Sequence, residues 1–531
     1  MRRFHSYGPV DCEQHFCVKR RELVEGCLDY IVGDPDKGGH YFTIWGPRQS
    51  GKTWLMREVK KEIENRHADF FSTISFSFGE IKGEVPEISM QTPTELPEGF
   101  SNLLKRHMPN HPEVKSWHHF MNIFSRQRGL WNRPVIMFID EVDVLPPVFI
   151  DMIVTRFREM YLDMGSYFLH GLALVGVRAV LGIESDRGSP FNVQRSLHVP
   201  NLSQDEVKDL LGQYQEESSQ CVEPSIVQKV YETTCGQPGL VSWFGELLTE
   251  KFNPGKDKAI GMKTWEKTYM RACTTEWNNT VLNLIKKARG EYREHVLELF
   301  CRSDIPFTLR ADWCNYMYLH GIIDHELGVD SMGEQGETCR FSSPFVQLAI
   351  YNALVYDLVG DRTPILALEP LDDLSDVFDR PILDVPALIS RYKDYLKRLK
   401  AKGLNPWKEQ PRRTDMHLTE AVGHFHLYAW LREAVGRYCS ISPEFPTGNG
   451  KVDLHLRCNG KQGIVEVKSF TDSRQAKEAV KQAAGYAASL GLDAVTVVLF
   501  VPVDDEAVLE KLSGEKTAED VHVTVCAIGW T

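Results

Sequence analysis

The segment GPRQSGKT at residues 46–53 constrains the fold of this chain more than any other feature. It follows an apolar strand pattern, YFTIW at 41–45, and precedes a helical pattern at 53–66. Glycines allow backbone N–H groups to surround an anion, and the N-terminus of the following helix adds its dipole. Strand, glycine-rich loop and helix in this order predict a phosphate-binding loop in a parallel α/β sheet. The residues expected to contact a bound nucleoside triphosphate are Gly46, Pro47, Arg48, Gln49, Ser50, Gly51, Lys52, Thr53 and Trp54.

The second half of the expected nucleotide site is PVIMFIDEVD at 134–143. Its apolar run ends in Asp140, and ligands of such sheets bind at the carboxyl ends of the strands. Asp140 and Thr53 are therefore expected to hold Mg²⁺, while Lys52 reaches the terminal phosphates. Glu141 is the expected base that orients and deprotonates the attacking water.

Strand and helix patterns alternate over the first 200 residues, which is typical of a parallel sheet covered by helices. Further strands are expected at 70–78, 135–139 and 172–177, with a surface loop at 79–99. From 203 the pattern becomes helical, and after about 290 helices accompany a short strand pair. We predict an α/β chain with a P-loop core at 1–202, a helical lid at 203–289, a winged helix at 290–358, a linker at 359–389 and a second α/β domain at 390–531.

Four short features of the first 358 residues form a further pattern: VKRREL at 18–23, Arg178 after the strand LALVGV, GSPFN at 188–192 and TTCGQPGLV at 233–241. This pattern resembles the signal-transduction ATPases of the AAA-like superclass (STAND type), which include the archaeal-type ATPases. The resemblance implies that ATP is the nucleotide, that Arg178 senses its terminal phosphate, and that the Gly-x-Pro segment ending in Pro238 contacts it. A surface arginine and a plain helix-breaking turn are the alternative interpretations of these two features.

A second set of chemically active residues lies near the C-terminus, in VDLHL at 452–456 and GIVEVKSF at 463–470. The two segments are expected to be adjacent strands. Glu466 and Lys468 are two residues apart and so project from one face of their strand, and Asp453 can meet Glu466 across the strand pair. Carboxylates that hold one or two divalent cations, with a nearby positive charge, are what phosphodiester cleavage requires.

This pattern resembles the PD-(D/E)xK nuclease superfamily, over about 390–531. The resemblance implies a further acid at Glu420 and, as in the RecB-like branch, a helix that carries Gln482 and Tyr486. It also implies that Asp453 and Glu466 bind Mg²⁺ or Mn²⁺ and that DNA is the substrate. The sequence departs from the family in having Gly-Lys-Val-Asp in place of Pro-Asp. The alternative for Asp453, Glu466 and Lys468 is a solvated charged strand face.

Composition limits the partners and the compartment. The net charge of −12 argues against coating of nucleic acid by the whole surface, although residues 391–413 carry nine basic and two acidic side chains. That run predicts either phosphate contact or a solvated helix face. Twelve cysteines without a Cys-x-x-Cys pair, no signal peptide and only short apolar stretches predict a reduced, cytoplasmic protein that does not enter a membrane. His424 and His426 are expected to be structural or to face DNA.

The combination favours an ATP-regulated, metal-dependent deoxyribonuclease in prokaryotic defence or mobile-element control, with an unidentified protein or nucleic-acid trigger. Assembly into a homo-oligomer is implied only by the resemblance to signal-transduction ATPases. The main alternative is a non-cutting ATPase regulator that binds DNA or a protein through the winged helix and an inactive nuclease fold. A third hypothesis is a transposition or replication-loader ATPase.

Overall fold

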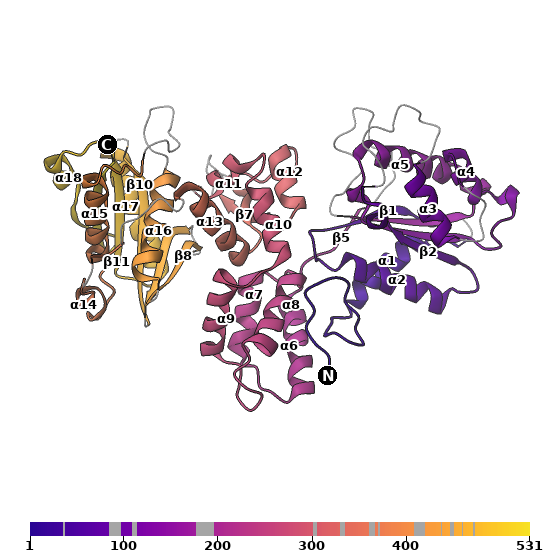
Figure 1. The fold of residues 1–531 in the computed structure, drawn as a ribbon, viewed down its shortest axis with the longest axis horizontal. Coiled ribbons are helices and arrows are strands. Elements are labelled where there is room, and N and C mark those ends of the chain that lie inside the picture. The colour runs from indigo at the N-terminus through magenta and orange to yellow at the C-terminus, as the bar shows by residue number, and fades with distance from the viewer. Residues whose placement is uncertain are drawn as a thin grey trace. The chain divides into compact units, whose positions relative to one another are not determined.

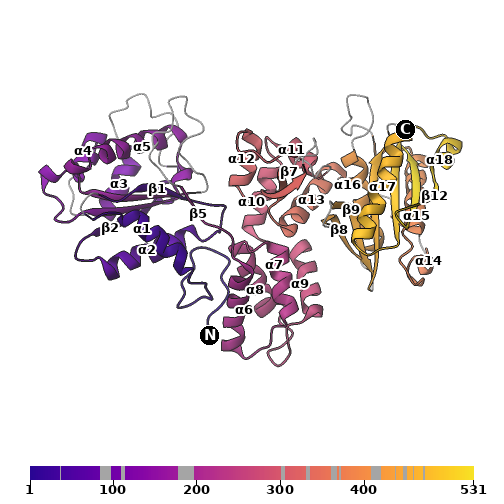
Figure 2. The same cartoon turned by 180° about the vertical axis from the view of Figure 1, so that it is seen from behind.

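The computed structural model describes residues 1–35, 38–83, 97–108, 114–176, 196–300, 305–329, 335–359, 367–369, 372–407, 420–436, 438–446, 451–458, 460–470 and 473–530 (Figures 1 and 2). The chain divides into two compact units. The first comprises Met1–Leu282, Cys314–Ile323 and Ser342–Pro344, and the second comprises Asn283–Trp313, Asp324–Phe341 and Phe345–Thr531. None of the described helices is long and apolar enough to cross a membrane.

A five-stranded parallel sheet forms the centre of the first unit, with the strand order β2-β3-β4-β1-β5. The strands are β1 (Tyr41–Trp45), β2 (Ser72–Ser77), β3 (Val135–Asp140), β4 (Leu169–Gly176) and β5 (Ser196–His198). The expected strands are confirmed at 41–45 and 135–139, while β2 is shorter than the apolar pattern at 70–78 and β4 begins earlier than 172. Residue 177 lies outside the described residues.

Helices cover both faces of this sheet, as Figure 1 shows. On one face lie α1 (Arg21–Val32) and α2 (Lys52–Arg66), and on the other lie α3 (Glu98–His107), α4 (Trp117–Ile123) and α5 (Pro147–Leu162). Alternate residues of β3 serve the two cores, because Ile136 and Phe138 pack with α1 and α2 while Met137 packs with α3 to α5. A strand buried on both faces reads as a continuous apolar run, which is why it was recognisable in the sequence.

The predicted helical region begins where the capping box of Ser203 and Glu206 starts α6. Its helices are α6 (Gln204–Ser218), α7 (Pro224–Thr234), α8 (Pro238–Glu246), α9 (Met262–Thr274) and α10 (Asn279–Ala288). After them come α11 (Arg293–Leu299), α12 (Asp312–Leu319), the two-stranded sheet of β6 (Ile323–Val329) and β7 (Gln335–Phe341), and α13 (Pro344–Val359). The short strand pair expected from the sequence is therefore present.

The C-terminal part contains a mixed six-stranded sheet with the order β12-β13-β11-β10-β9-β8. Its strands are β8 (Ser440–Pro446), β9 (Lys451–Cys458), β10 (Lys461–Ser469), β11 (Ala494–Val501), β12 (Gly514–Ala518) and β13 (Val521–Gly529). Strands β9 and β10 pair antiparallel, as expected, and β10 pairs parallel with β11. The helices are α14 (Ser375–Phe378), α15 (Val385–Ala401), α16 (Glu420–Val435), α17 (Ser473–Ser489) and α18 (Glu506–Leu512). Helix α17 packs on the face that presents Val497 and Leu499, and α16 meets the opposite face, where Gly423 lies against Phe500.

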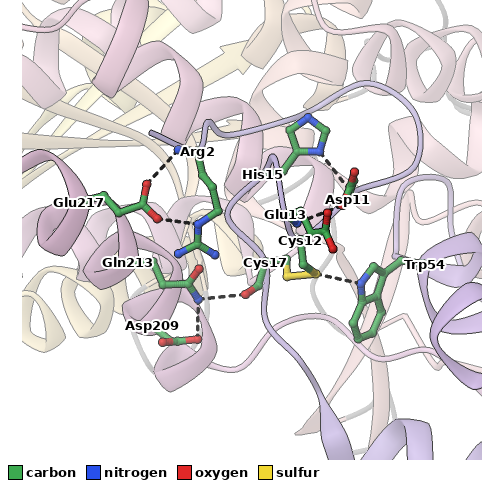
Figure 3. Close-up of a disulfide and its surroundings, with 10 residues drawn as sticks. All are labelled: Arg2, Asp11, Cys12, Glu13, His15, Cys17, Trp54, Asp209, Gln213 and Glu217. Atoms are coloured by element: carbon green, nitrogen blue, oxygen red, sulfur yellow. Dashed lines mark hydrogen bonds and ion pairs between the residues drawn. A yellow bond between two sulfur atoms is a disulfide. The ribbon is translucent and has the colours of Figure 1, made fainter. Parts of the chain in front are cut away.

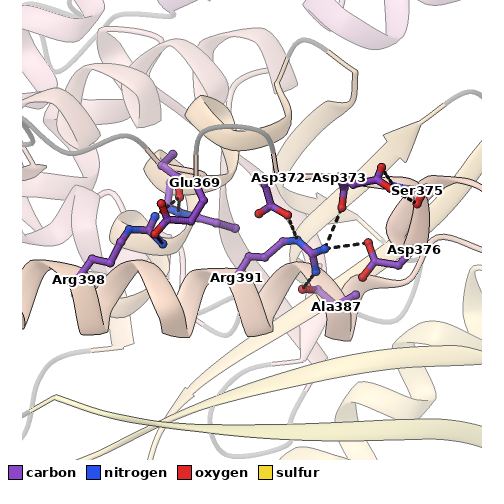
Figure 4. A network of polar contacts seen from close by, with 10 residues as sticks. Glu369, Asp372, Asp373, Ser375, Asp376, Ala387, Arg391 and Arg398 are labelled. Atoms are coloured by element: carbon purple, nitrogen blue, oxygen red, sulfur yellow. Dashed lines mark hydrogen bonds and ion pairs between the residues drawn. The ribbon is translucent and has the colours of Figure 1, made fainter.

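Several acids of the segment expected to be a linker lie beside α15 (Figure 4). The Arg391 guanidinium of α15 pairs with Asp372 (3.3 Å) and Asp376 (2.9 Å) and donates to two backbone carbonyls. Arg398 pairs with Glu369 at 3.0 Å, and Lys400 pairs with Asp504. Arg391, Arg398 and Lys400 are therefore paired with acids of the same unit, which favours a structural role over phosphate contact for these three residues. Residues 408–413 lie outside the described residues.

Two disulfides depart from the expectation of unpaired cysteines. Cys12 is bonded to Cys17, and Cys439 to Cys458. In Figure 3 the first disulfide lies beside Trp54 of α2, whose indole Nε1 donates to Cys12 Sγ at 3.4 Å, while Gln213 of α6 donates to the Cys17 carbonyl at 2.9 Å. The second pair joins the residue before β8 to the end of β9. Both pairings depend on the path of the backbone, so Cys spacing alone did not predict them.

Candidate functional site

The glycine-rich loop closes around the ammonium group of its own lysine. Lys52 Nζ donates to the carbonyls of Gly46 (2.7 Å) and Pro47 (2.6 Å). Burial lowers the pKa of Lys52 to about 8, although the negative charges of Asp143 and Asp140 act in the opposite direction. An anion that entered the loop would find this positive charge already present, together with the first N–H groups of α2.

The geometry of the loop favours glycine at positions 46 and 51. A Cβ on Gly46 would lie 2.8 Å from Ser50 Oγ and 3.3 Å from the Val199 carbonyl oxygen. Gly51 caps α2 with φ of 94°, a conformation that other residues rarely adopt. The backbone therefore follows the path expected of a phosphate-binding loop.

Thr53 and Asp140 meet across this site, as the sequence predicted. Thr53 Oγ1 donates to Asp140 Oδ2 at 2.6 Å, and the Glu141 backbone N–H donates to Asp140 Oδ1 at 2.8 Å. Burial raises the pKa of Asp140, and these two hydrogen bonds oppose the increase. A threonine hydroxyl beside a carboxylate at the end of β3 supplies the hard oxygen ligands that Mg²⁺ prefers.

Glu141 is held by a residue that the sequence reasoning missed. Ser77 Oγ donates to Glu141 Oε2 at 2.7 Å, and Glu141 itself has a left-handed backbone with φ of 54°. A Cβ on Gly79 would lie 1.8 Å from the same carboxylate oxygen, so a larger residue there would displace the Glu141 carboxylate. Ser77 pairs with Asp140 in the strand register. A polar residue at the end of β2 was the available signal, because neighbouring parallel strands end at one edge of the sheet.

The GQPG segment contacts the loop directly. The Gln237 side chain caps α8 by accepting from Leu240 N at 2.5 Å, and its Nε2 donates to the Arg48 carbonyl at 2.9 Å. The Gln49 side chain fills the space beside Gly239, where a Cβ would lie 2.2 Å from its Oε1. Pro238 is the first residue of α8. The segment is thus both a helix-starting turn and a contact of the loop.

Trp54 and Arg178 were also expected to contact the nucleotide. Trp54 is buried in the core shared by α1, α2 and the sheet, and its N–H is directed to Cys12. Arg178 and the segment 188–192 lie outside the described residues, so their roles stay predictions.

The C-terminal candidate residues converge on one lysine. Lys468 Nζ lies 3.0 Å from both Glu420 Oε1, at the start of α16, and Glu466 Oε1. Asp453 Oδ2 accepts from the Val467 N–H at 2.5 Å, which brings this carboxylate to the same end of β10. Glu420, Glu466 and Asp453 therefore gather around Lys468, and a simple solvated strand face is excluded because Glu466 is only 2% exposed.

Burial and charge perturb both groups at the centre of this cluster. Burial, reinforced by Asp453, raises the pKa of Glu466 to about 8, although Lys468 opposes the shift. Burial also lowers the pKa of Lys468, but Glu466, Asp453 and Glu420 outweigh it and hold that pKa well above its usual value. Such perturbed pairs are typical of functional sites but also occur in structural ion pairs.

A divalent cation fits the cluster in one respect and not in another. Glu466 Oε2 is buried without a hydrogen-bond partner, and a bound cation would satisfy it. Within the described ranges, however, no three Asp, Glu, His or Cys side chains are arranged so that they could hold a metal ion. Any cation would therefore require Lys468 or a carboxylate to move.

Gln482 and Tyr486 lie together on α17, as their spacing predicted. Gln482 Nε2 donates to Tyr486 Oη at 2.7 Å. Burial and then the charge of Glu466 raise the pKa of Tyr486, with smaller effects of Lys468 and Asp453, so the phenol lies within electrostatic reach of the cluster.

The two histidines of α16 are buried, which contradicts a DNA-facing role and confirms a structural one. His424 Nε2 bonds to the Asp453 carbonyl at 2.9 Å, and His426 Nδ1 to Tyr392 Oη at 2.6 Å. Burial lowers the pKa of His426 to about 4.

No family model matches the chain, and no curated protein matches it in sequence. Among solved structures, the Walker-type ATPase of Pyrococcus abyssi is 14% identical with a TM-score of 0.44, over 65% of this chain and 99% of its own. The Orc1 protein of Aeropyrum pernix in complex with DNA is 15% identical with a TM-score of 0.32, over 64% and 92%. Cdc6p of Pyrobaculum aerophilum is 13% identical with a TM-score of 0.36, over 66% and 98%. Likeness at these scores carries no information about the activity of this chain.

Proposed function

We propose that the chain is an AAA-like ATPase of the signal-transduction type that controls a metal-dependent DNA-cleaving domain in its C-terminal part. The observation that carries the proposal is the presence of two separate groups of acidic side chains, each of which surrounds a lysine. Lys52 and Asp140 belong to the first centre, and Lys468 and Glu466 belong to the second.

The nucleotide half rests on the contacts of the loop. ATP phosphates would take the Lys52 ammonium from the carbonyls of Gly46 and Pro47, which are poorer partners than an anion. Thr53 and Asp140 would hold the Mg²⁺ that accompanies ATP, and this ion would offset the negative charge of the phosphates. Glu141 would orient the attacking water, and Arg178 would contact the terminal phosphate.

The cleavage half rests on the cluster around Glu466. Asp453 and Glu466 would hold Mg²⁺ or Mn²⁺, with Glu420 as a further acid. A bound cation supplies Lewis-acid polarisation of the scissile phosphate. Lys468 would orient the attacking water and stabilise the charge that develops on the phosphate, while Gln482 and Tyr486 would contact the DNA backbone.

The link between the halves follows from their presence in one chain. A nucleotide switch upstream of a cutting centre suits a system that must stay inactive until a trigger arrives. We therefore place the protein in prokaryotic defence or mobile-element control, in the cytoplasm, with DNA as substrate, a protein or nucleic-acid trigger and assembly into a homo-oligomer.

A second candidate is a non-cutting regulator in which the C-terminal fold is a docking platform. The Lys468 contacts with both Glu420 and Glu466 favour this candidate. In the described residues these carboxylates bind the lysine, and no group of three ligands is arranged to hold a metal ion. A docking platform does not explain why Glu466 Oε2 is buried without a hydrogen-bond partner.

Calorimetric titration of Mn²⁺ separates the two candidates. The hypothesis of a DNA-cleaving domain predicts one or two Mn²⁺ sites in the wild type. It predicts weak or no Mn²⁺ binding in Asp453→Asn, which keeps the shape of the side chain and removes its charge. An exposed acid such as Glu510→Gln serves as the control and should bind as the wild type does. Absence of Mn²⁺ binding by the wild type would favour the platform.

A further inference from the structure

The backbone carbonyl of Asp453 is fixed by a buried histidine from another element. His424 of α16 is 2% exposed, and its Nε2 lies 2.9 Å from that carbonyl oxygen. A carbonyl oxygen only accepts hydrogen bonds, so the proton of the neutral imidazole is on Nε2. Nδ1 can therefore accept a hydrogen bond. The contact fixes the backbone of β9 at Asp453, the residue whose negative charge acts on Glu466.

The other side of the same imidazole is held by α13. Tyr351 Oη lies 3.3 Å from His424 Nδ1, and its hydroxyl is the donor because Nδ1 accepts. Tyr351 is fully buried. A hydrogen-bonded chain thus runs from α13 through His424 to Asp453.

Helices α13 and α16 pack tightly against each other, so a displacement of α13 is expected to displace α16. Tyr351 stacks on Phe425 with ring centroids 4.5 Å apart, and Tyr428 Oη donates to Asn352 Oδ1 at 2.8 Å. Phe300, which precedes this region, packs against both Tyr351 (5.1 Å) and Phe425 (5.9 Å). A close-packed aromatic cluster has few alternative arrangements, so a shift of α13 carries α16 with it.

We propose that Tyr351 and His424 are positioning residues through which α13, in the predicted winged helix, sets the place of Asp453 in the acidic cluster. The inference rests on the proposed function, because it concerns metal binding by Asp453 and Glu466. It adds to that function a physical route by which events in residues 290–358 reach the cutting centre. Neither residue touches the cation or the DNA.

Helix α16 offers a matched control two residues along. His426 faces the other side of the helix, since two residues subtend about 200°, and its Nδ1 bonds to Tyr392 Oη at 2.6 Å. Tyr351→Phe and Tyr392→Phe each remove one buried hydroxyl from one buried histidine of the same helix. Only the first change breaks the chain to Asp453.

The experiment measures Mn²⁺ affinity and melting temperature of the full chain for both variants. We expect comparable losses of melting temperature, but a Mn²⁺ dissociation constant raised about tenfold only in Tyr351→Phe, the low end for residues that orient a ligand. Equal Mn²⁺ affinities in the two variants, with a wild type that binds Mn²⁺, would overturn the inference. A wild type that binds no Mn²⁺ would instead overturn the proposed function.

A second pair of variants covers the case in which Tyr351→Phe fails to fold. His424→Gln keeps a side-chain N–H that can donate to the Asp453 carbonyl, whereas His424→Leu has no donor. The inference expects Mn²⁺ affinity near that of the wild type in His424→Gln and a clear loss in His424→Leu. The same affinity in both would contradict a positioning role.

Discussion

Individual charges at the two centres are satisfied in different ways. Lys52 is held by carbonyl oxygens, which a phosphate can replace at little cost, whereas Lys468 is held by the carboxylates Glu420 and Glu466. A cation entering the second centre must compete with an ammonium group that the carboxylates already bind. The first centre therefore needs less rearrangement than the second before it can bind its ligand.

The separation of roles at the nucleotide centre can be tested with two substitutions. Lys52→Ala removes the charge that phosphates require, so we expect ATP binding itself to be lost. Glu141→Gln keeps the Ser77 hydrogen bond but removes the base, so binding should persist while the hydrolysis rate falls about 100-fold or more. Fluorescent-nucleotide titration and phosphate release measure the two quantities. Loss of binding in Glu141→Gln, or undiminished turnover, would contradict the assigned role.

Buried His426 predicts a loss of stability in acid. Its pKa in the folded chain is about 4 against 6.5 for an ordinary histidine, so the unfolded chain takes up the proton first as the pH falls. The stabilisation is fully present above pH 6.5 and is lost between about pH 6.5 and 4, with a total on the order of 3 kcal/mol.

Urea unfolding of His426→Gln between pH 7 and 4 measures this contribution. The variant should show a shallower decline of the unfolding free energy over that window than the wild type. The exposed His522→Gln is the matched control and should decline as the wild type does. Parallel slopes for wild type and His426→Gln would show that His426 is not the group responsible.

Elements defined by their own periodicity were predictable, and those defined by a distant partner were not. The apolar runs of β1 and β3 predicted strands close to their observed bounds, because burial on both faces leaves a continuous apolar signal. The acidic segment before α15 was read as a linker from its composition, yet its acids pair with Arg391. Composition cannot distinguish a solvated acid from one that faces a cation on another element.

The docking of this acidic segment on α15 has a measurable consequence. Arg391→Gln leaves Asp372 and Asp376 without their partner, and the four contacts of a guanidinium that is 20% exposed are lost. We expect a decrease of about 1–3 kcal/mol in the free energy of unfolding, with no change in DNA affinity. The exposed Lys402→Gln should change neither. Weaker DNA binding by a fully stable Arg391→Gln would restore the phosphate-contact interpretation.

Site residues followed the same rule as the elements. Thr53, Asp140, Glu466 and Lys468 were found from spacing within or beside a strand, because backbone geometry fixes which face and which end they occupy. Ser77 was missed, and His424 was left open between a structural and a DNA-facing role, since the roles of both arise from contacts over long sequence separations. The two disulfides belong to the same class.

At the scale of the whole molecule, the sequence predicted a parallel sheet covered by helices, a helical region, and a second α/β domain, and the described residues contain all three. The predicted domain boundaries stay predictions. Residues 290–358, expected to form one winged helix, are divided between the two compact units. Most of that segment, including α13 from Phe345 onward, belongs to the same unit as the C-terminal sheet, as the proposed positioning of Asp453 by α13 requires.

The central claim is that nucleotide binding in the first unit governs metal-dependent cutting by the second. The most direct test is cleavage of circular duplex DNA with Mn²⁺, in the presence and absence of ATP, by wild type, Lys52→Ala and Asp453→Ala. The account predicts that cutting by the wild type depends on ATP, that Lys52→Ala loses this dependence, and that Asp453→Ala does not cut. Cutting by Asp453→Ala, or wild-type cutting that is unaffected by both ATP and Lys52→Ala, would contradict it.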